Sequence, residues 1–216
     1  MPYNRDLDEL MRLAVEVNLR PQYRIFAEFA ELRGQGVRRG ALDKLRCFLD
    51  LATFWPFPER LVFVRWLLEK SRKFSDSSIV LPQVARERLV VPTVREWSEA
   101  NSAEAEPWLW LGLLRCDRPA RHLERALALD PSCDLARKTL IEWIISDIKY
   151  NQHHLPQFYI YDPRGDLKDL DQAESLIEGR AIDEWATEVQ REITELRRLA
   201  AQWVIDHPRP GDFAVH

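Results

Sequence analysis

The segment from Asn151 to Asp166 carries the residue types best suited to bind a ligand. It reads Asn-Gln-His-His-Leu-Pro-Gln-Phe-Tyr-Ile-Tyr-Asp-Pro-Arg-Gly-Asp, so imidazole, phenol and guanidinium groups lie close together in the chain. Such a mixture could line a small-molecule pocket or contact a partner protein. The candidate binding residues are His153, His154, Phe158, Tyr159, Tyr161 and Arg164.

The same segment has a plainer interpretation. A long link inside a helical domain is typically functional or disordered, and the run Phe158 to Tyr161 is too apolar to favour disorder. Its rings would then either contact a ligand or plug a groove at the end of a helical stack. Both alternatives stay open at the level of sequence.

Metal and catalytic sites are not indicated. Adjacent histidines in an extended stretch point to opposite sides, so His153 and His154 are poorly placed to share one ion. The chain has no His-Glu-x-x-His or Glu-x-x-His pair, no Gly-x-Ser-x-Gly elbow and no phosphate loop. We therefore predict no metal, no cofactor and no catalytic residue, and the sequence favours a protein that is not an enzyme.

A second candidate is the basic segment Arg33-Gly-Gln-Gly-Val-Arg-Arg-Gly40, in which Arg33, Arg38 and Arg39 accompany three glycines. Backbone N–H groups and guanidinium groups of this kind can bind phosphate. The spacing misses the dinucleotide fingerprint by one residue, and it follows a helical pattern where that fingerprint needs a strand. A glycine-capped helix end with solvated arginines is the favoured interpretation, and nucleic-acid binding is the weaker alternative.

The stretch from Pro107 to Pro131 indicates a helical hairpin. Trp108, Leu111 and Gly112 fit the spacing Trp-x-x-Leu-Gly, and a second helix would end at Asp130-Pro131 because proline cannot continue it. This stretch resembles a tetratricopeptide repeat over about residues 104–143. The resemblance implies stacked hairpins with a concave surface that binds peptides. Arg115 and Glu124 replace the tyrosine and phenylalanine of the family pattern, which favours an irregular array.

These candidates must be positioned by helices, because apolar residues recur at helical spacing along almost the whole chain. Pro56, Pro82 and Pro92 punctuate the pattern. The predicted helices lie near 5–18, from Pro21 to Gly34 or Gly36, after Gly40 as far as Ala52, 59–73, two short ones within 81–100, 107–130 as the hairpin, Cys133 to about Tyr150, and Ala181 to Ile205.

Composition and charge limit the classes of partner and the location that we expect for the protein. The net charge is −4, with 17 Lys and Arg against 14 Asp and Glu in residues 1–100 and 14 against 21 in residues 101–216, which disfavours nucleic acid as a partner. Three cysteines without Cys-x-x-Cys spacing indicate reduced thiols, and no apolar run is long enough to span a bilayer. We expect a cytoplasmic protein with no membrane contact.

The sequence thus predicts an all-α protein, an irregular stack of antiparallel, tetratricopeptide-like hairpins with about nine to eleven helices. We expect a single domain over residues 1–206 and a tail over 207–216. The leading functional hypothesis is a non-enzymatic interaction module that binds a peptide or protein partner. The alternative is a small-molecule binder or enzyme that uses the 151–166 segment.

Overall fold

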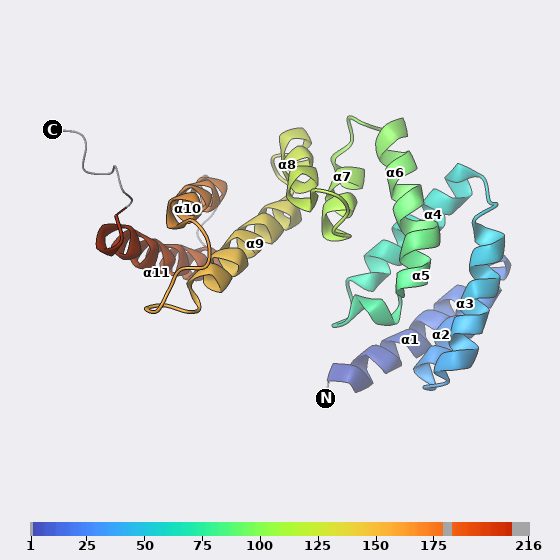
Figure 1. Ribbon diagram of the computed structural model, residues 1–216. Coiled ribbons are helices and arrows are strands. Elements are labelled where there is room, and N and C mark those ends of the chain that lie inside the picture. Colours follow the sequence, from blue (N-terminus) through green and yellow to red (C-terminus); the bar gives the residue numbers. More distant parts are fainter. Residues whose placement is uncertain (1, 179–182, 209–216) are drawn as a thin grey trace. The chain divides into compact units, whose positions relative to one another are not determined.

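The computed structural model describes residues 2–178 and 183–208, and every regular element in these ranges is helical. The chain divides into two compact units, residues 1–119 and 120–216, which we describe separately (Figure 1). The first unit holds α1 (Pro2–Asn18), α2 (Arg24–Gly34), α3 (Arg38–Ala52), α4 (Phe57–Ser71), α5 (Gln83–Ala85), α6 (Val91–Ala100) and α7 (Ala105–Leu113), with short turns η1 (Pro21–Tyr23), η2 (Ser77–Ile79) and η3 (Arg86–Val90).

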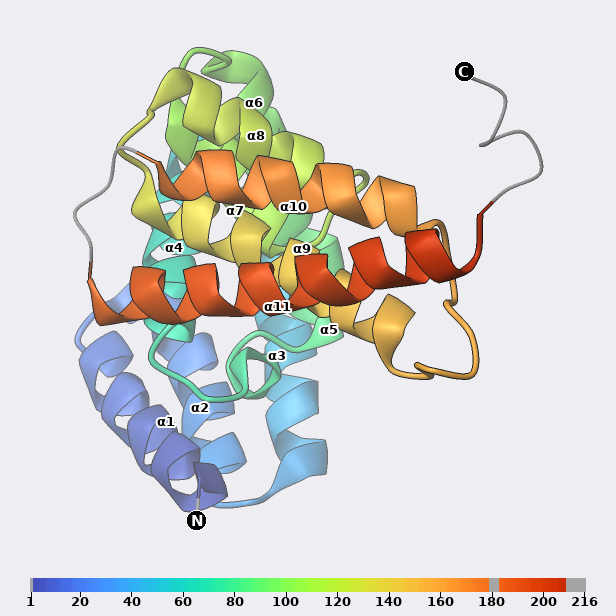
Figure 2. The same cartoon turned by 90° about the vertical axis from the view of Figure 1, so that its left-hand side faces the viewer.

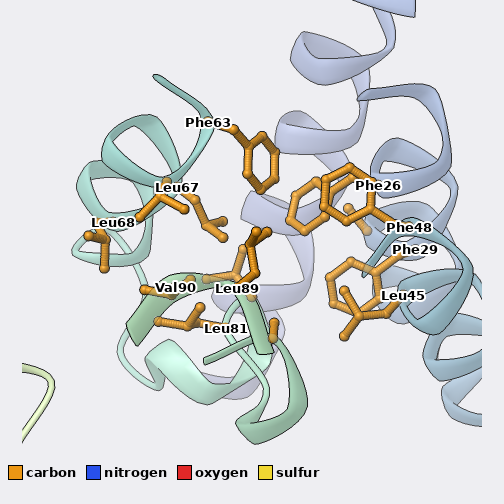
Figure 3. Close-up of a cluster of buried hydrophobic side chains, with 14 of the residues drawn as sticks. Phe26, Phe29, Leu45, Phe48, Phe63, Leu67, Leu68, Leu81, Leu89 and Val90 are labelled. Carbon is orange, nitrogen blue, oxygen red and sulfur yellow. The ribbon is translucent and has the colours of Figure 1, made fainter. Parts of the chain in front are cut away.

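The core of the first unit is built around α2, which packs against both α1 and α3. Phe26 and Phe29 of α2 are fully buried, and their rings lie 5.3 Å apart. Phe48 of α3 and Phe63 of α4 both pack on the ring of Phe26, while Leu89 and Val90 of η3 close the other side of the cluster (Figure 3). Buried aromatic side chains contribute most to such cores, so this cluster fixes how the helices pack.

The turn between α2 and α3 is a glycine-capped helix end, in agreement with the favoured interpretation of the Arg33–Gly40 segment. The Val37 N–H donates to Leu32 O at 2.8 Å and the Gly36 N–H donates to Arg33 O at 3.1 Å, which is the Schellman pattern. Gly36 has φ +80°, a conformation that side-chain-bearing residues rarely adopt. Helix α3 then begins at Arg38, earlier than the predicted start after Gly40, so Gly40 lies inside it.

Pro92 does not divide two short helices, and that prediction is wrong. The chain is helical without a break from Gln83 to Ala100, because η3 is a π-helical turn that widens the helix just before the proline. Proline lacks an N–H and its ring clashes with the carbonyl four residues earlier, and a π turn relieves both problems. Leu89 and Val90 are thereby turned into the core.

A buried carboxylate ties α1 to the turn after α4. Asp6 accepts hydrogen bonds from the Ser75 N–H at 2.9 Å, the Ser75 hydroxyl at 2.5 Å and the Asp76 N–H at 3.2 Å. These bonds, above all that of the Ser75 hydroxyl, hold the pKa of Asp6 below its ordinary value. A carboxylate bonded in this way fixes the turn to α1.

The second unit holds α8 (Pro119–Leu129, which begins at the division), α9 (Asp134–Gln152), α10 (Pro163–Ile177) and α11 (Glu184–Asp206). Helices α10 and α11 lie side by side in opposite directions, and both contact α9 (Figure 2). Their shared core consists of apolar residues, namely Ile141, Ile145, Ile148, Leu170, Ala173, Val189, Ile193 and Leu196. Arg197 of α11 reinforces the pair from outside by bonding Asp171 and Glu174 of α10.

The prediction of an all-α protein with about nine to eleven helices is confirmed, since the described ranges hold ten helices besides the one-turn α5. The predicted start of the last helix, Ala181, lies outside the described residues, as do residues 209–216 of the predicted tail. The single domain over residues 1–206 stays a prediction. No helix within the described ranges is long and apolar enough to cross a membrane.

We predict opposite effects for two glycine substitutions in the first unit. Gly36→Ala places a side chain at positive φ and should lower the free energy of unfolding by about 1–2 kcal/mol. Gly40→Ala should raise it by about 0.4–1 kcal/mol, because that helical position leaves ordinary contact distances of 3.4 Å to Val37 and 3.6 Å to Leu32. Urea denaturation of both variants checks this, and equal midpoints would contradict the left-handed cap.

Candidate functional site

The link between α9 and α10 is shorter than the sequence predicts. Helix α9 extends through Gln152, and α10 begins at Pro163, whose missing N–H suits the first turn of a helix. Asp162 caps α10 by accepting a hydrogen bond from the Arg164 N–H at 3.2 Å. Only residues 153–162 are therefore non-helical, and they begin and end at fixed helix termini.

Tyr159 holds this link to the unit through buried hydrogen bonds. Its hydroxyl donates to Asp166 Oδ2 at 2.6 Å and accepts from Gln152 Nε2 at 3.1 Å. Gln152 also donates to the Leu196 carbonyl at 3.0 Å, and Asn151 donates to both oxygens of Asp166, at 2.9 and 3.1 Å. Four polar side chains from α9, the link and α10 thus bond one another, which anchors the link against α11.

The electrostatics of this network suit a structural role. Burial raises the pKa of Tyr159 well above its ordinary value, and its hydrogen bond to Asp166 raises it further. Burial also raises the pKa of Asp166, although the bonds from Tyr159 and Asn151 partly oppose this. A phenol with a raised pKa keeps its proton and serves as a hydrogen-bond donor rather than as a general base.

The other candidate residues of the link lie at the surface. The His154 ring packs against His153 at 3.8 Å and stacks on Phe158 at 4.5 Å between centroids, forming an exposed row of rings. Tyr161 is 67% exposed, and Arg164 is half-buried in the first turn of α10. The structure therefore separates Tyr159 from the exposed rings instead of joining all six residues in one pocket.

Tyr161 does border a cleft of about 440 Å³, together with Tyr150 and three carboxylates, Asp147, Asp166 and Asp169. Burial raises the pKa of Asp169, and the charge of Asp147 adds to the effect. His154 and Arg164 do not line this cleft. In the described part of the chain, no three His, Cys, Asp or Glu side chains are grouped to hold a metal ion.

The arginines of the basic segment flank the turn between α2 and α3. Arg38 and Arg39 are exposed in the first turn of α3, while Arg33 is half-buried in the last turn of α2. Nearby Lys44, which would extend a basic surface, pairs with Glu28 at 2.5 Å. Arg33, in the last turn of α2, complements the negative end of that helix, as expected for a capped helix end.

The two helices of the predicted Trp108 hairpin, α7 and α8, belong to different units of the chain. Leu111 and Gly112 are buried in α7, whereas Trp108 is half-buried and donates its indole N–H to Ser102 O at 3.2 Å. Pro131 is exposed just after α8. Trp110, which lies outside the repeat pattern, is the more deeply buried tryptophan of α7, at 6% exposure.

A site that sequence reasoning missed lies at the edge of the aromatic core. Tyr23, Trp55, Pro58 and Val62, with Gln22 and Glu59 beside them, line a cleft of about 470 Å³. Tyr23 and Trp55 are 5.7 Å apart between ring centroids, and both pack on Phe63. The sequence did hold a signal for this cleft. The helix over residues 57–71 is apolar nearly all round, which predicts burial on every side, yet Val62 is 58% exposed.

A further large apolar side chain is exposed next to this cleft in the chain. Phe54 precedes Trp55 and is 88% exposed, the largest exposed fraction among the large hydrophobic residues of the described chain. Exposed apolar side chains that gather at one place are typical of binding surfaces. Glu59 is the single charged residue among those that line the cleft.

Comparisons with protein-family models, curated proteins and solved structures gave no match to this chain. The tetratricopeptide resemblance stays a prediction.

We predict that Tyr159→Phe lowers the free energy of unfolding by about 1–3 kcal/mol, because Asp166 and Gln152 each lose a buried partner. The matched control is Tyr161→Phe, which removes a hydroxyl from an exposed ring and should change stability by less than about 0.5 kcal/mol. Urea denaturation followed by circular dichroism measures both. Equal losses would show that the network does not anchor the link.

A pH-dependent effect should follow from the raised pKa of Asp169. At about pH 7 the charge of Asp147 opposes the ionisation of Asp169, so Asp147→Asn should raise Tm. The gain should shrink at an acidic pH, where Asp169 takes up its proton in the folded state, because a raised carboxyl pKa lowers stability only as the pH increases past the unfolded value. Thermal denaturation at both pH values checks this, and an equal gain at both would refute the repulsion.

Proposed function

We propose that this protein is a non-enzymatic interaction module whose apolar cleft at Tyr23, Trp55 and Val62 binds a segment of a partner protein. The observation that carries the proposal is the exposure of Phe54 and Val62 beside a cleft whose walls are rings of the core. Rigid aromatic walls lose little entropy when a partner binds, and they favour large apolar anchors.

The cleft also suggests what the partner presents. Its volume of about 470 Å³ lies within the range of specific binding pockets and suits a bulky apolar side chain. Glu59 at its edge would complement a basic neighbour of that side chain. We therefore infer a peptide segment with a bulky apolar residue next to Lys or Arg.

The exposed rings of the second unit are compatible with the same function. His153, His154, Phe158 and Tyr161 remain candidate contact residues, because exposed aromatic side chains are enriched at protein interfaces. A small-molecule site in the 151–166 segment would need one pocket that joins Tyr159 or Tyr161 with His154 and Arg164. The cleft beside Tyr161 includes neither of the latter two residues, so this alternative has little support.

A selection of random peptides on the purified protein tests the proposal. We expect the enriched peptides to share a bulky apolar residue beside a basic one, and Val62→Asp to weaken their binding by about 30-fold or more, as for a central interface residue. The control is Val15→Asp, which places the same charge at another exposed valine, on α1, and should leave affinity unchanged.

The proposal fails if the selected peptides bind the Val62→Asp variant as tightly as the unaltered protein. It also fails if they carry no apolar residue in common. A partner captured from the native cell should, in turn, be displaced by a selected peptide. Isothermal titration calorimetry provides the affinities.

A further inference from the structure

A second cleft of the first unit gathers three guanidinium groups. It has a volume of about 690 Å³ and lies between η2, the helical stretch α5–η3–α6 and the end of α7. Its lining includes Arg86 of η3, Arg95 of α6 and Arg115 after α7, together with the hydroxyl-bearing Ser77 and Ser78 of η2. These residues come from separate elements, so the fold rather than a local motif brings them together.

The backbone of Arg115 is the most informative feature of this cleft. The Cys116 N–H donates to Leu111 O at 3.1 Å and the Arg115 N–H donates to Gly112 O at 2.8 Å, so α7 ends in a Schellman motif. Arg115 takes its left-handed position, with φ +50°. The same position after α2 is held by Gly36, at φ +80°. An arginine there carries backbone strain that glycine would avoid.

The two other arginines are held at the walls of the cleft. Arg86 donates through a guanidinium nitrogen to the Leu114 carbonyl, next to Arg115 in the chain. Arg95 is exposed and pairs with Asp117 at 3.3 Å, although the Asp117 side chain is 91% exposed. An ion pair this exposed contributes little and can be exchanged for another anion.

The charge balance of the lining favours an anion. Glu87 and Asp117 are the carboxylates among the lining residues, so the three guanidinium groups outnumber them. Burial raises the pKa of Cys116, which also lines the cleft, so its thiol keeps its proton and is not a nucleophile. The chemistry available here is binding rather than catalysis.

We propose that this cleft binds a phosphoryl group through Arg86, Arg95 and Arg115, with the hydroxyls of Ser77 and Ser78 as further donors. Guanidinium groups bind phosphate oxygens in pairs of parallel hydrogen bonds, and several of them can surround one tetrahedral anion. Strained residues that the surrounding structure holds in place occur preferentially at binding sites. The strain at Arg115 is then offset by what its side chain binds. This site is separate from the apolar cleft, so either proposal can fail alone.

The test uses Arg115→Gly, whose two expected effects have opposite signs. Glycine relieves the positive φ, so Tm without ligand should rise by about 2–8 °C. Affinity for inorganic phosphate, measured by calorimetry against sodium chloride of equal ionic strength, should fall about tenfold or more. Arg95→Gln, at an exposed position, should weaken phosphate binding without a gain in Tm.

Arg118→Gly is the matched control, because Arg118 also has a positive φ, +54°, but does not line the cleft. It should raise Tm and leave phosphate affinity unchanged. Titration of a phosphoserine peptide beside inorganic phosphate shows whether the group arrives on a protein or as a free ion. The proposal is overturned if phosphate gives no more binding than chloride, or if Arg115→Gly binds phosphate as well as the unaltered protein does.

Discussion

The first unit depends on the packing of one ring, Phe63. It meets five other rings, with centroid distances of 4.9 Å to Tyr23 and Phe48, 5.2 Å to Phe26, 5.7 Å to Trp66 and 6.1 Å to Trp55. These rings come from η1, α2, α3, α4 and the link between α3 and α4, so one side chain sets the distances among five segments. Edge and tilted contacts of this kind add to the free energy of burial itself. The apolar cleft is the outer side of the same arrangement.

The second unit is held by different means. Its helices share an aliphatic core, but the link between α9 and α10 is fixed by the polar network of Tyr159, Asp166, Gln152 and Asn151. Extended residues alternate in direction, so anchoring Tyr159 leaves Phe158 at the surface. A rigidly anchored link can present exposed rings at low entropic cost, which suits the proposed role in partner binding.

Two helix ends in the first unit solve the same geometric problem with different residues. Both α2 and α7 end in a left-handed residue that frees the chain to turn, but α2 uses Gly36 and α7 uses Arg115. A side chain added at Gly36 would meet open space, so the left-handed turn alone accounts for the glycine. The arginine adds strain and also adds charge to a cleft that already holds Arg86 and Arg95. The apolar and basic clefts thus belong to one unit but offer different chemistry.

The helices could be predicted from the sequence, because the apolar stripe of a helix is a local pattern. It placed α9 and most of α11 closely, and it identified the capped end at Gly36. It misjudged Pro92, since a π turn depends on how Leu89 and Val90 pack, and it made the link before α10 too long. The position and the lining of the two clefts depend on tertiary packing. The residues of each cleft lie on separate segments that meet only when the chain packs: Tyr23, Trp55 and Val62 in the apolar cleft, and Ser77, Arg86 and Arg115 in the basic one.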